Sequence, residues 1–231
     1  MTPPLSDRLR ACCGYIYPGE RVADIGADHG YLGISLLLSG IASTVIASDI
    51  SSMPLDVAHH NAHKYGVADR MTFYLSDGVK NIPRDFDVMV CAGMGADTIM
   101  HILNASPWLR SEKYRLVLQC QSRRPTLREY LYRAGWHISR ETLAKDGKFL
   151  YPVIEAVYGP AEPLTPGGYY ISPALLESDS ELLPAFYDRV ISGLRKTVDG
   201  LSRSGGDMLN TYQTILTELL ELEARIHGNR S

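Results

Sequence analysis

The stretch VADIGADHGYLG, residues 22–33, is the most informative segment of this chain. In it a short apolar run, Val22–Ile25, leads through a glycine turn into an apolar helical segment, Tyr31–Leu38. A strand, a glycine turn and a helix in this order are typical of the first unit of a nucleotide-binding α/β sheet. One position departs from that pattern, because Asp28 stands where a second glycine is usual. A carboxylate there either obstructs a ligand or adds chemistry to the site.

Short β-rich runs alternate with helical patterns through the first 160 residues. This alternation predicts βαβ units that form an open, doubly wound α/β sheet. The predicted strands are 22–25, 44–48, 71–75, 86–91 and 115–119. The predicted helices are 31–38, 55–66, 98–104 and 125–133. Two alternating segments around the Asp146-Gly147 turn predict an antiparallel pair at the end of the sheet.

A Pro- and Gly-rich segment, 159–168, separates this domain from a different pattern. From Leu182 onward apolar residues recur at helical spacing, and a second such stripe spans 209–226 after the turn segment 202–207. We therefore expect a domain at 1–160 and a coiled-coil-like helical hairpin at 161–231. The hairpin could clamp a large substrate or mediate dimerisation, or each stripe could simply cover the other. Whether the protein is a monomer or a homodimer stays open.

Composition indicates an ordinary globular protein of 231 residues, 45% hydrophobic and 21% charged. The N-terminus lacks the apolar core of a signal peptide, and the apolar runs fall short of the roughly 20 residues that a membrane span needs, so we expect a cytoplasmic protein without a membrane segment. The cysteines show no C-x-x-C pair and are expected to be reduced core residues. His59 and His63 have the spacing of zinc ligands but no acidic partner, so no metal is expected.

Basic residues concentrate in the middle of the chain. The net charge is −3 overall, yet residues 110–148 hold 10 Lys and Arg against 4 Asp and Glu. Within this block Arg123, Arg124, Arg128 and Arg133 lie close together. They predict a contact surface for phosphates, and we assign Arg123, Arg124 and Arg128 to substrate binding. The alternative is a solvated helix face.

Acidic residues recur where predicted strands end, at Asp24, Asp49 and Asp77, and the small residues AGMG follow a fourth strand at 92–95. The carboxyl ends of parallel strands meet at one edge of a sheet, where ligands bind. Asp49 is placed to accept hydrogen bonds from ribose hydroxyls, and Asp77 from the exocyclic amine of an adenine. Turn formation is the alternative for Asp49 and Asp77, and helix capping is the alternative for Asp28.

The acidic loop discriminates between ligands. A pyrophosphate needs a loop with free N–H groups and no negative side chains, whereas Asp24 and Asp28 flank Gly26. S-adenosylmethionine has no phosphate and carries a sulfonium and an ammonium, so the loop favours this cofactor over NAD. An NAD-dependent oxidoreductase remains the alternative from another enzyme class.

Seven motifs together resemble a known family. They are LSDRL (5–9), VADIGADHGYL (22–32), AGMG (92–95), LVLQ (116–119), LREYL (127–131), GWHI (135–138) and DGKFL (146–150). In order and spacing they resemble the bacterial tRNA (adenine-N1)-methyltransferases that modify the D-arm adenine at tRNA position 22. The match covers most of residues 5–160. The sequence departs from the family pattern at QCQ (119–121), where Q-P-N is usual, and at Gly30 and Gly33, which replace Ala and Pro.

The resemblance implies a class I methyltransferase with a Rossmann-like fold, S-adenosylmethionine as methyl donor and tRNA as substrate. The expected cofactor-binding residues are Asp24, Gly26, Asp49, Ile50, Asp77, Gly78, Ala92, Gly93 and Met94. The expected catalytic residues are Asp28, His29 and Tyr31.

Adenine N1 lies on the Watson–Crick edge of the base, so the base must turn into a pocket. We expect Tyr31 to stack on it, with Trp136 as a second candidate. The product adenine is cationic, and we hypothesise that Asp28 stabilises the developing charge by accepting a hydrogen bond from the exocyclic amine. Other readings are methylation of another RNA base, a protein or a small molecule, and a non-catalytic protein that binds tRNA or S-adenosylmethionine.

Overall fold

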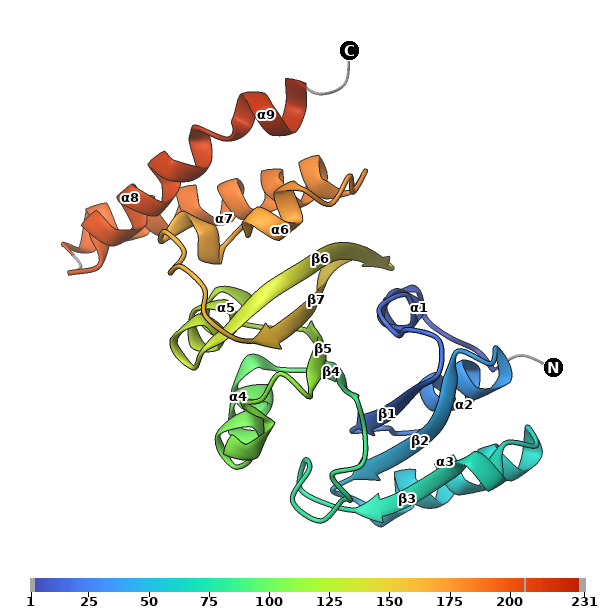
Figure 1. The fold of residues 1–231 in the computed structure, drawn as a ribbon. Helices are drawn as coiled ribbons and strands as arrows, with labels where there is room; N and C mark the ends of the chain where they lie inside the picture. Colours follow the sequence, from blue (N-terminus) through green and yellow to red (C-terminus); the bar gives the residue numbers. More distant parts are fainter. Residues whose placement is uncertain (1–2, 206, 229–231) are drawn as a thin grey trace.

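A seven-stranded sheet organises the computed structural model, which describes residues 3–205 and 207–228 (Figure 1). The strand order is β3-β2-β1-β4-β5-β7-β6. The five parallel strands are β1 (Glu20–Ile25), β2 (Ala42–Asp49), β3 (Met71–Leu75), β4 (Val88–Met94) and β5 (Arg115–Cys120). The antiparallel pair is β6 (Trp136–Asp146) and β7 (Phe149–Tyr158), and β7 joins β5. The predicted doubly wound sheet with its antiparallel end is confirmed.

Helices cover both faces of the sheet. They are α1 (Asp7–Cys13), α2 (Tyr31–Leu38), α3 (Ser52–Lys64), α4 (Ala96–Asn104) and α5 (Arg124–Arg133). Two buried apolar clusters result, one containing α2 residues and the other containing residues of α4 and α5. The central strands are apolar along nearly their whole length because both of their faces are buried. Because β1 to β5 pair in parallel, their carboxyl ends lie together at one edge of the sheet.

Element boundaries follow the predictions except where local packing changes them. The predicted strand 86–91 runs instead from Val88 to Met94, because Phe86 packs against Trp108 and Tyr114 before the strand begins. The strand then continues into the AGMG segment through an irregularity between Ala92 and Met94. Helix α3 begins two residues before Pro54, since a proline in the first turn lacks an N–H that would otherwise be unpaired. Helix α1 was absent from the predicted elements.

The C-terminal helices pack beyond the β6–β7 pair (Figure 1). They are α6 (Pro173–Leu176), α7 (Leu183–Ser204), α8 (Leu209–Leu220) and α9 (Glu223–Gly228). The second predicted stripe is therefore two helices, and its Ile226 still joins the cluster of the hairpin. That cluster includes Leu143 and Leu150, so the hairpin packs on the sheet as well as on itself. Gly206 of the predicted turn segment lies outside the described residues.

Two expectations concern the four cysteines, which were expected to be reduced, and the length and apolar character of the helices. All four cysteines are free, and Cys12, Cys91 and Cys120 are buried, as expected of reduced core residues. Burial raises the pKa of the Cys12 and Cys91 thiols far above their usual range. Within residues 3–205 and 207–228, no helix combines the length and the apolar character required to cross a bilayer.

Candidate functional site

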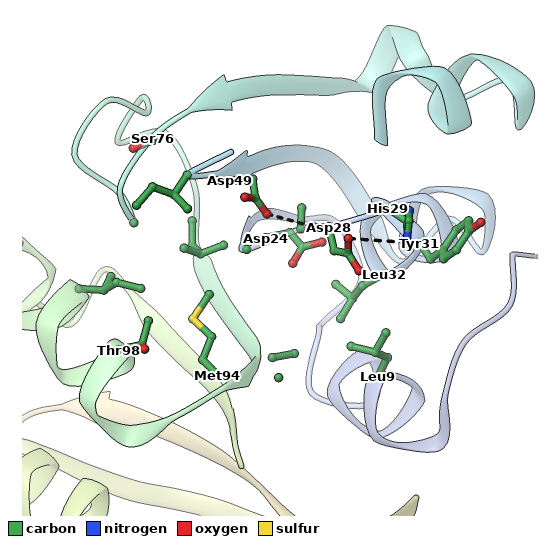
Figure 2. A pocket seen from close by; sticks show the side chains of 18 of the residues that line it. Leu9, Asp24, Asp28, His29, Tyr31, Leu32, Asp49, Ser76, Met94 and Thr98 are labelled. Carbon is green, nitrogen blue, oxygen red and sulfur yellow. Dashed lines mark hydrogen bonds and ion pairs between the residues drawn. The ribbon is translucent and has the colours of Figure 1, made fainter. Parts of the chain in front are cut away.

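A cavity of about 420 Å³ opens at the carboxyl ends of the parallel strands (Figure 2). Its walls come from the loop after β1, the end of β2, the loop after β3, the end of β4, and residues of α1 and α4. Twelve predicted site residues line it: Asp24, Gly26, Asp28, His29, Tyr31, Asp49, Ile50, Asp77, Gly78, Ala92, Gly93 and Met94. All residues that the sequence assigned to the cofactor and to catalysis are thus brought together, and the predicted arginines are not among them.

Gly26 allows the β1 loop to approach the end of β4. Its φ is +72°, in the left-handed region that side chains other than glycine rarely adopt. A Cβ at this position would lie 2.4 Å from Cε of Met94. The N–H groups of Gly26 and Ala27 both donate to the carbonyl of Ser48, which ties the loop to β2. The loop is therefore held in a conformation that keeps this wall of the cavity free of a side chain.

Asp28 also has a positive φ, of 49°. Glycine adopts this left-handed region without strain, and Asp is one of the few other residues that tolerate it. The Asp28 N–H donates to Oδ2 of Asp49 over 3.4 Å. Helix capping by Asp28 is excluded in this structure, since Gly30 is the N-cap of α2 and no side chain caps the helix. The Asp28 carboxylate is instead exposed at the cavity.

His29 and Tyr31 line the same side of the cavity as Asp28, farther from its interior. His29 Nε2 lies 3.7 Å from Oδ1 of Asp28, and the His29 ring centroid lies 5.6 Å from that of Tyr31. Figure 2 shows Asp24, Asp28 and Asp49 gathered together, with Tyr31 at the side and directed away from them. Tyr31 thus lies at the rim of the cavity, while Asp28 stands between the rim and the interior.

Asp24 is the buried carboxyl of the site. Its side chain is 4% exposed, and burial raises its pKa to about 7. The Gly33 N–H donates to this carboxyl, but Oδ2 has no hydrogen-bond partner. A buried carboxylate oxygen without a partner is costly, and a cationic ligand group removes that cost. Asp24 therefore suits an ammonium group in the cavity.

Asp49 and Asp77 each form a local turn contact as well as lining the cavity. Oδ1 of Asp49 accepts the Ser51 N–H at 2.9 Å. Oδ2 of Asp77 pairs with Lys80, and the same oxygen lies 3.6 Å from Nε2 of His101. The bond from Lys80 holds the pKa of Asp77 below its usual value. The turn interpretation and the ligand interpretation are thus compatible for both residues.

Arg8 is a pocket residue that was not among the predicted site residues. Its Nε donates to Oδ2 of Asp146 at 3.1 Å, and its Nη1 donates to Oε1 of Gln119 at 3.2 Å. The same Gln119 oxygen accepts the Gly93 N–H, and a Cβ on Gly93 would lie 2.9 Å from Arg8 Nη1. The guanidinium therefore occupies the space above Gly93. Among the residues that line this cavity, Arg8 is the one Arg or Lys.

The predicted arginine cluster divides in the structure. Arg128 was expected to contact substrate phosphates, and this prediction is wrong because the side chain is fully buried. It pairs with Glu141, also fully buried, and its Nη1 donates to the Tyr169 carbonyl at 3.1 Å. Arg123 is exposed and pairs with Asp97 at 2.7 Å. Arg124 is half-buried, and that burial lowers the pKa of its guanidinium.

Two further expectations concern Trp136 and the histidines of α3. Trp136 is 1% exposed, so it cannot stack on a substrate base. His59 and His63 pack edge to face on α3 with ring centroids 4.6 Å apart. Across the described residues, no group of three or more His, Cys, Asp or Glu side chains is arranged to hold a metal ion.

Comparisons with known proteins agree with this geometry. A family model described as a methyltransferase domain matches residues 5–154. The tRNA (adenine(22)-N(1))-methyltransferase of Bacillus subtilis (strain 168) is 33% identical over 156 residues, which are 67% of this chain and 66% of that protein. The match therefore spans just under two thirds of that relative's own length.

Solved structures extend the likeness to nearly the whole chain. The B. subtilis tRNA methyltransferase TrmK has a TM-score of 0.78 at 26% identity, covering 97% of this chain and 98% of that one. The M. capricolum TrmK, solved in complex with S-adenosyl-homocysteine, has a TM-score of 0.80 at 22% identity, covering 96% of this chain and 99% of that one. The C-terminal helices are therefore part of the shared fold.

Proposed function

This chain belongs to the methyltransferase-domain family, and from that premise we propose that it transfers a methyl group from S-adenosylmethionine to N1 of adenine 22 in the D arm of tRNA. One observation carries the proposal. The acidic set Asp24, Asp28, Asp49 and Asp77 converges on a single cavity in a chain that is 33% identical to an enzyme of this activity. The expected alternative, an NAD-dependent enzyme, fits poorly, because a pyrophosphate would meet these carboxylates.

The residues present fit S-adenosylmethionine at both ends of its methionine part. The unpartnered Oδ2 of Asp24 suits the ammonium group, and the Arg8 guanidinium suits the carboxylate. We assign Asp49 to the ribose hydroxyls and Asp77 to the adenine amine, and Ile50 and Gly78 line the same cavity. When bound, this cofactor supplies an electrophilic methyl group on a sulfonium. Ala92, Gly93 and Met94 complete the proposed cofactor wall, where the Arg8 guanidinium lies against Gly93.

Asp28 is proposed to act on the acceptor base. Attack by adenine N1 leaves the base with a positive charge, which a fixed carboxylate stabilises more in the transition state than in the ground state. The Asp28 carboxylate is exposed, and the main chain that carries it has a positive φ and donates to Asp49. Asp28 therefore accepts a hydrogen bond from the exocyclic amine when N1 faces the methyl group.

Access of the base requires unstacking, which costs a few kcal/mol. Tyr31 at the rim offers an aromatic surface that offsets this cost, and His29 lies beside it. We propose different roles for the two parts of the chain. Residues 1–160 hold all lining residues of the cavity, and residues 161–231 extend the surface available to tRNA.

Methyl transfer to unmodified bacterial tRNA tests this function. The protein is incubated with labelled S-adenosylmethionine and tRNA, and the digested product is analysed by nucleoside mass spectrometry. A 1-methyladenosine signal is expected. A protein that binds S-adenosylmethionine tightly but produces no methylated nucleoside would overturn the tRNA assignment, and a protein that binds NAD instead would overturn the cofactor.

A further inference from the structure

A second cavity, of about 500 Å³, lies beyond the first one, between the β6–β7 turn, the start of α5 and the face of α7. We call it the hairpin groove. The charged residues that line it are Arg124, Lys148 and Arg189, and no Asp or Glu is among its lining residues. Three cations without a carboxylate form a site for an anion, because nothing in the groove neutralises them.

Aromatic side chains stand among these cations. Phe149, Tyr151 and Phe186 line the groove, and Phe149 is 52% exposed although it is a large apolar residue. The Phe149 and Tyr151 ring centroids are 6.0 Å apart, and Nζ of Lys148 lies 5.3 Å from the Phe149 centroid. An exposed aromatic ring interleaved with basic side chains is the arrangement by which proteins stack a base and hold its phosphate.

The cationic side chains are held in place by contacts between separate elements. Nη1 of Arg124 donates to the Leu150 carbonyl at 3.0 Å, and its guanidinium lies 5.3 Å from the Phe186 ring centroid. Nη1 of Arg189 on α7 donates to the Lys148 carbonyl at 2.7 Å. These bonds use one donor group of each guanidinium, and each arginine has five N–H donors. Both arginines can therefore keep these hydrogen bonds and still donate to a bound anion.

The hairpin groove adjoins the proposed active site. Gln121 lines the groove, and its N–H donates to the carbonyl of Met94, which lines the first cavity. On the other side, Asp146 at the start of the β6–β7 turn accepts from Arg8 of the first cavity. One tight turn thus separates the place where Arg8 is held from the exposed ring of Phe149.

We propose that the hairpin groove binds a nucleotide of the RNA substrate that neighbours the methylated adenine, with its base on Phe149 and its phosphate against Lys148, Arg124 and Arg189. The inference rests on the proposed function, because it assumes that the acceptor in the first cavity is part of an RNA. Turning the target base out of its stack leaves its neighbours without a stacking partner. The groove supplies such a partner within reach of the site.

The test compares Phe149→Ala and Lys148→Glu with the control Lys64→Glu in the full-length protein. Lys64 is an exposed lysine in the last turn of α3 and lines none of the cavities described here. The Kd for unmodified tRNA is measured at two salt concentrations, and the Kd for S-adenosylmethionine is measured by calorimetry. Thermal unfolding checks that the variants remain folded, which is expected because both groove residues are exposed.

Phe149→Ala is expected to weaken tRNA binding about ten-fold. Lys148→Glu is expected to weaken it by a similar factor and to reduce the slope of log K against log salt by about one. Binding of S-adenosylmethionine is expected to be unchanged in both, and Lys64→Glu to match the wild type. If the wild type methylates tRNA and both groove variants bind it like Lys64→Glu, the groove assignment is overturned. If the wild type neither binds nor methylates tRNA, the proposed function itself fails.

Discussion

The backbone N–H of Asp28 donates to Oδ2 of Asp49 over 3.4 Å, so the loop after β1 is joined to the end of β2 through an acidic residue at each side. This bond uses the main chain of Asp28 and leaves its carboxylate exposed at the cavity. The position requires a left-handed backbone, which glycine would satisfy with less strain. An aspartate in such a place costs stability and adds a fixed charge, which is the expected pattern for a functional residue.

Replacing Asp28 by Asn is expected to reduce methyl transfer about 100-fold, because Asn tolerates the positive φ but carries no charge to stabilise the cationic base. The Kd for S-adenosylmethionine is expected to stay within about three-fold, since we assign the methionine part to Asp24 and Arg8. Single-turnover kinetics and calorimetry separate the two effects. Equal losses in turnover and in cofactor binding would place Asp28 in the cofactor site alone.

Asp28→Gly serves as the matched control for strain. It relieves the left-handed backbone, so its free energy of unfolding is expected to equal or exceed that of the wild type by up to about 1 kcal/mol. Its methyl transfer is expected to fall as in Asp28→Asn. A Gly variant that retains full activity would show that the carboxylate has no role in the reaction.

The affinity for S-adenosylmethionine is expected to rise between pH 5.5 and 7. The pKa of Asp24 is raised to about 7, and an ammonium group binds its ionised form. The α-amino group of the cofactor stays protonated in this range, because amines of this kind titrate near 7.7–8.0. Asp24→Asn is expected to bind more weakly with no rise over this range, as calorimetry would detect. A parallel rise in the variant would assign the pH dependence to another group.

The same Asp24 carboxyl predicts the sign of the pH effect on stability without ligand. Between its unfolded pKa, about 3.9, and its folded pKa, about 7, the native state binds more protons than the unfolded state. The free energy of unfolding therefore falls as pH rises through this window. Asp24→Asn is expected to unfold at higher urea concentration than the wild type at pH 8, and the difference should narrow at pH 5.

Arg8→Ala is expected to weaken binding of S-adenosylmethionine by about ten-fold or more, because it removes the guanidinium from the wall of the first cavity. Arg10→Ala is the control on the same helix, since Arg10 is exposed and contacts its own segment, Asp7 at 3.7 Å and the Leu5 carbonyl at 3.1 Å. Calorimetry on both variants measures the difference. Equal affinities in the two variants would remove Arg8 from the cofactor site.

Arg128→Ala is expected to destabilise the fold by about 3–5 kcal/mol, because it leaves the buried Glu141 carboxylate without its charged partner. The double variant Arg128→Met, Glu141→Leu is expected to lose much less, since it removes both charges. Arg133 is exposed and pairs with Glu129 on the same helix. Arg133→Ala is therefore expected to lower the free energy of unfolding by less than about 1 kcal/mol. Urea unfolding distinguishes this structural role from RNA binding. A stable Arg128→Ala variant with reduced tRNA affinity would contradict it.

Local patterns predicted the sheet and most of the acidic site. The β6–β7 pair was predictable because alternation and the Asp146-Gly147 turn act over neighbouring residues. The acidic residues were predictable because parallel strands bring their carboxyl ends to one edge, wherever they lie in the chain. The left-handed backbone conformation of Asp28, which a glycine would also adopt, was visible only in the structure.

Contacts between distant segments could not be predicted. Arg8 enters the site because it bonds to Asp146, 138 residues away, and no local pattern encodes that pairing. Arg128 looked like part of a basic surface, yet it lies one position after Leu127 on the buried face of α5, where Glu141 of β6 receives it. The tertiary partner decides whether a charged residue binds a ligand or stabilises the core.

The position of the methyl group in tRNA is the critical test of methylation at adenine 22. Wild-type protein is supplied with S-adenosylmethionine and two transcripts of one tRNA, which carry adenosine or guanosine at position 22. We expect 1-methyladenosine at position 22 of the first transcript and no methyl transfer to the second. Equal methylation of both transcripts, or a methylated base elsewhere, would contradict the account.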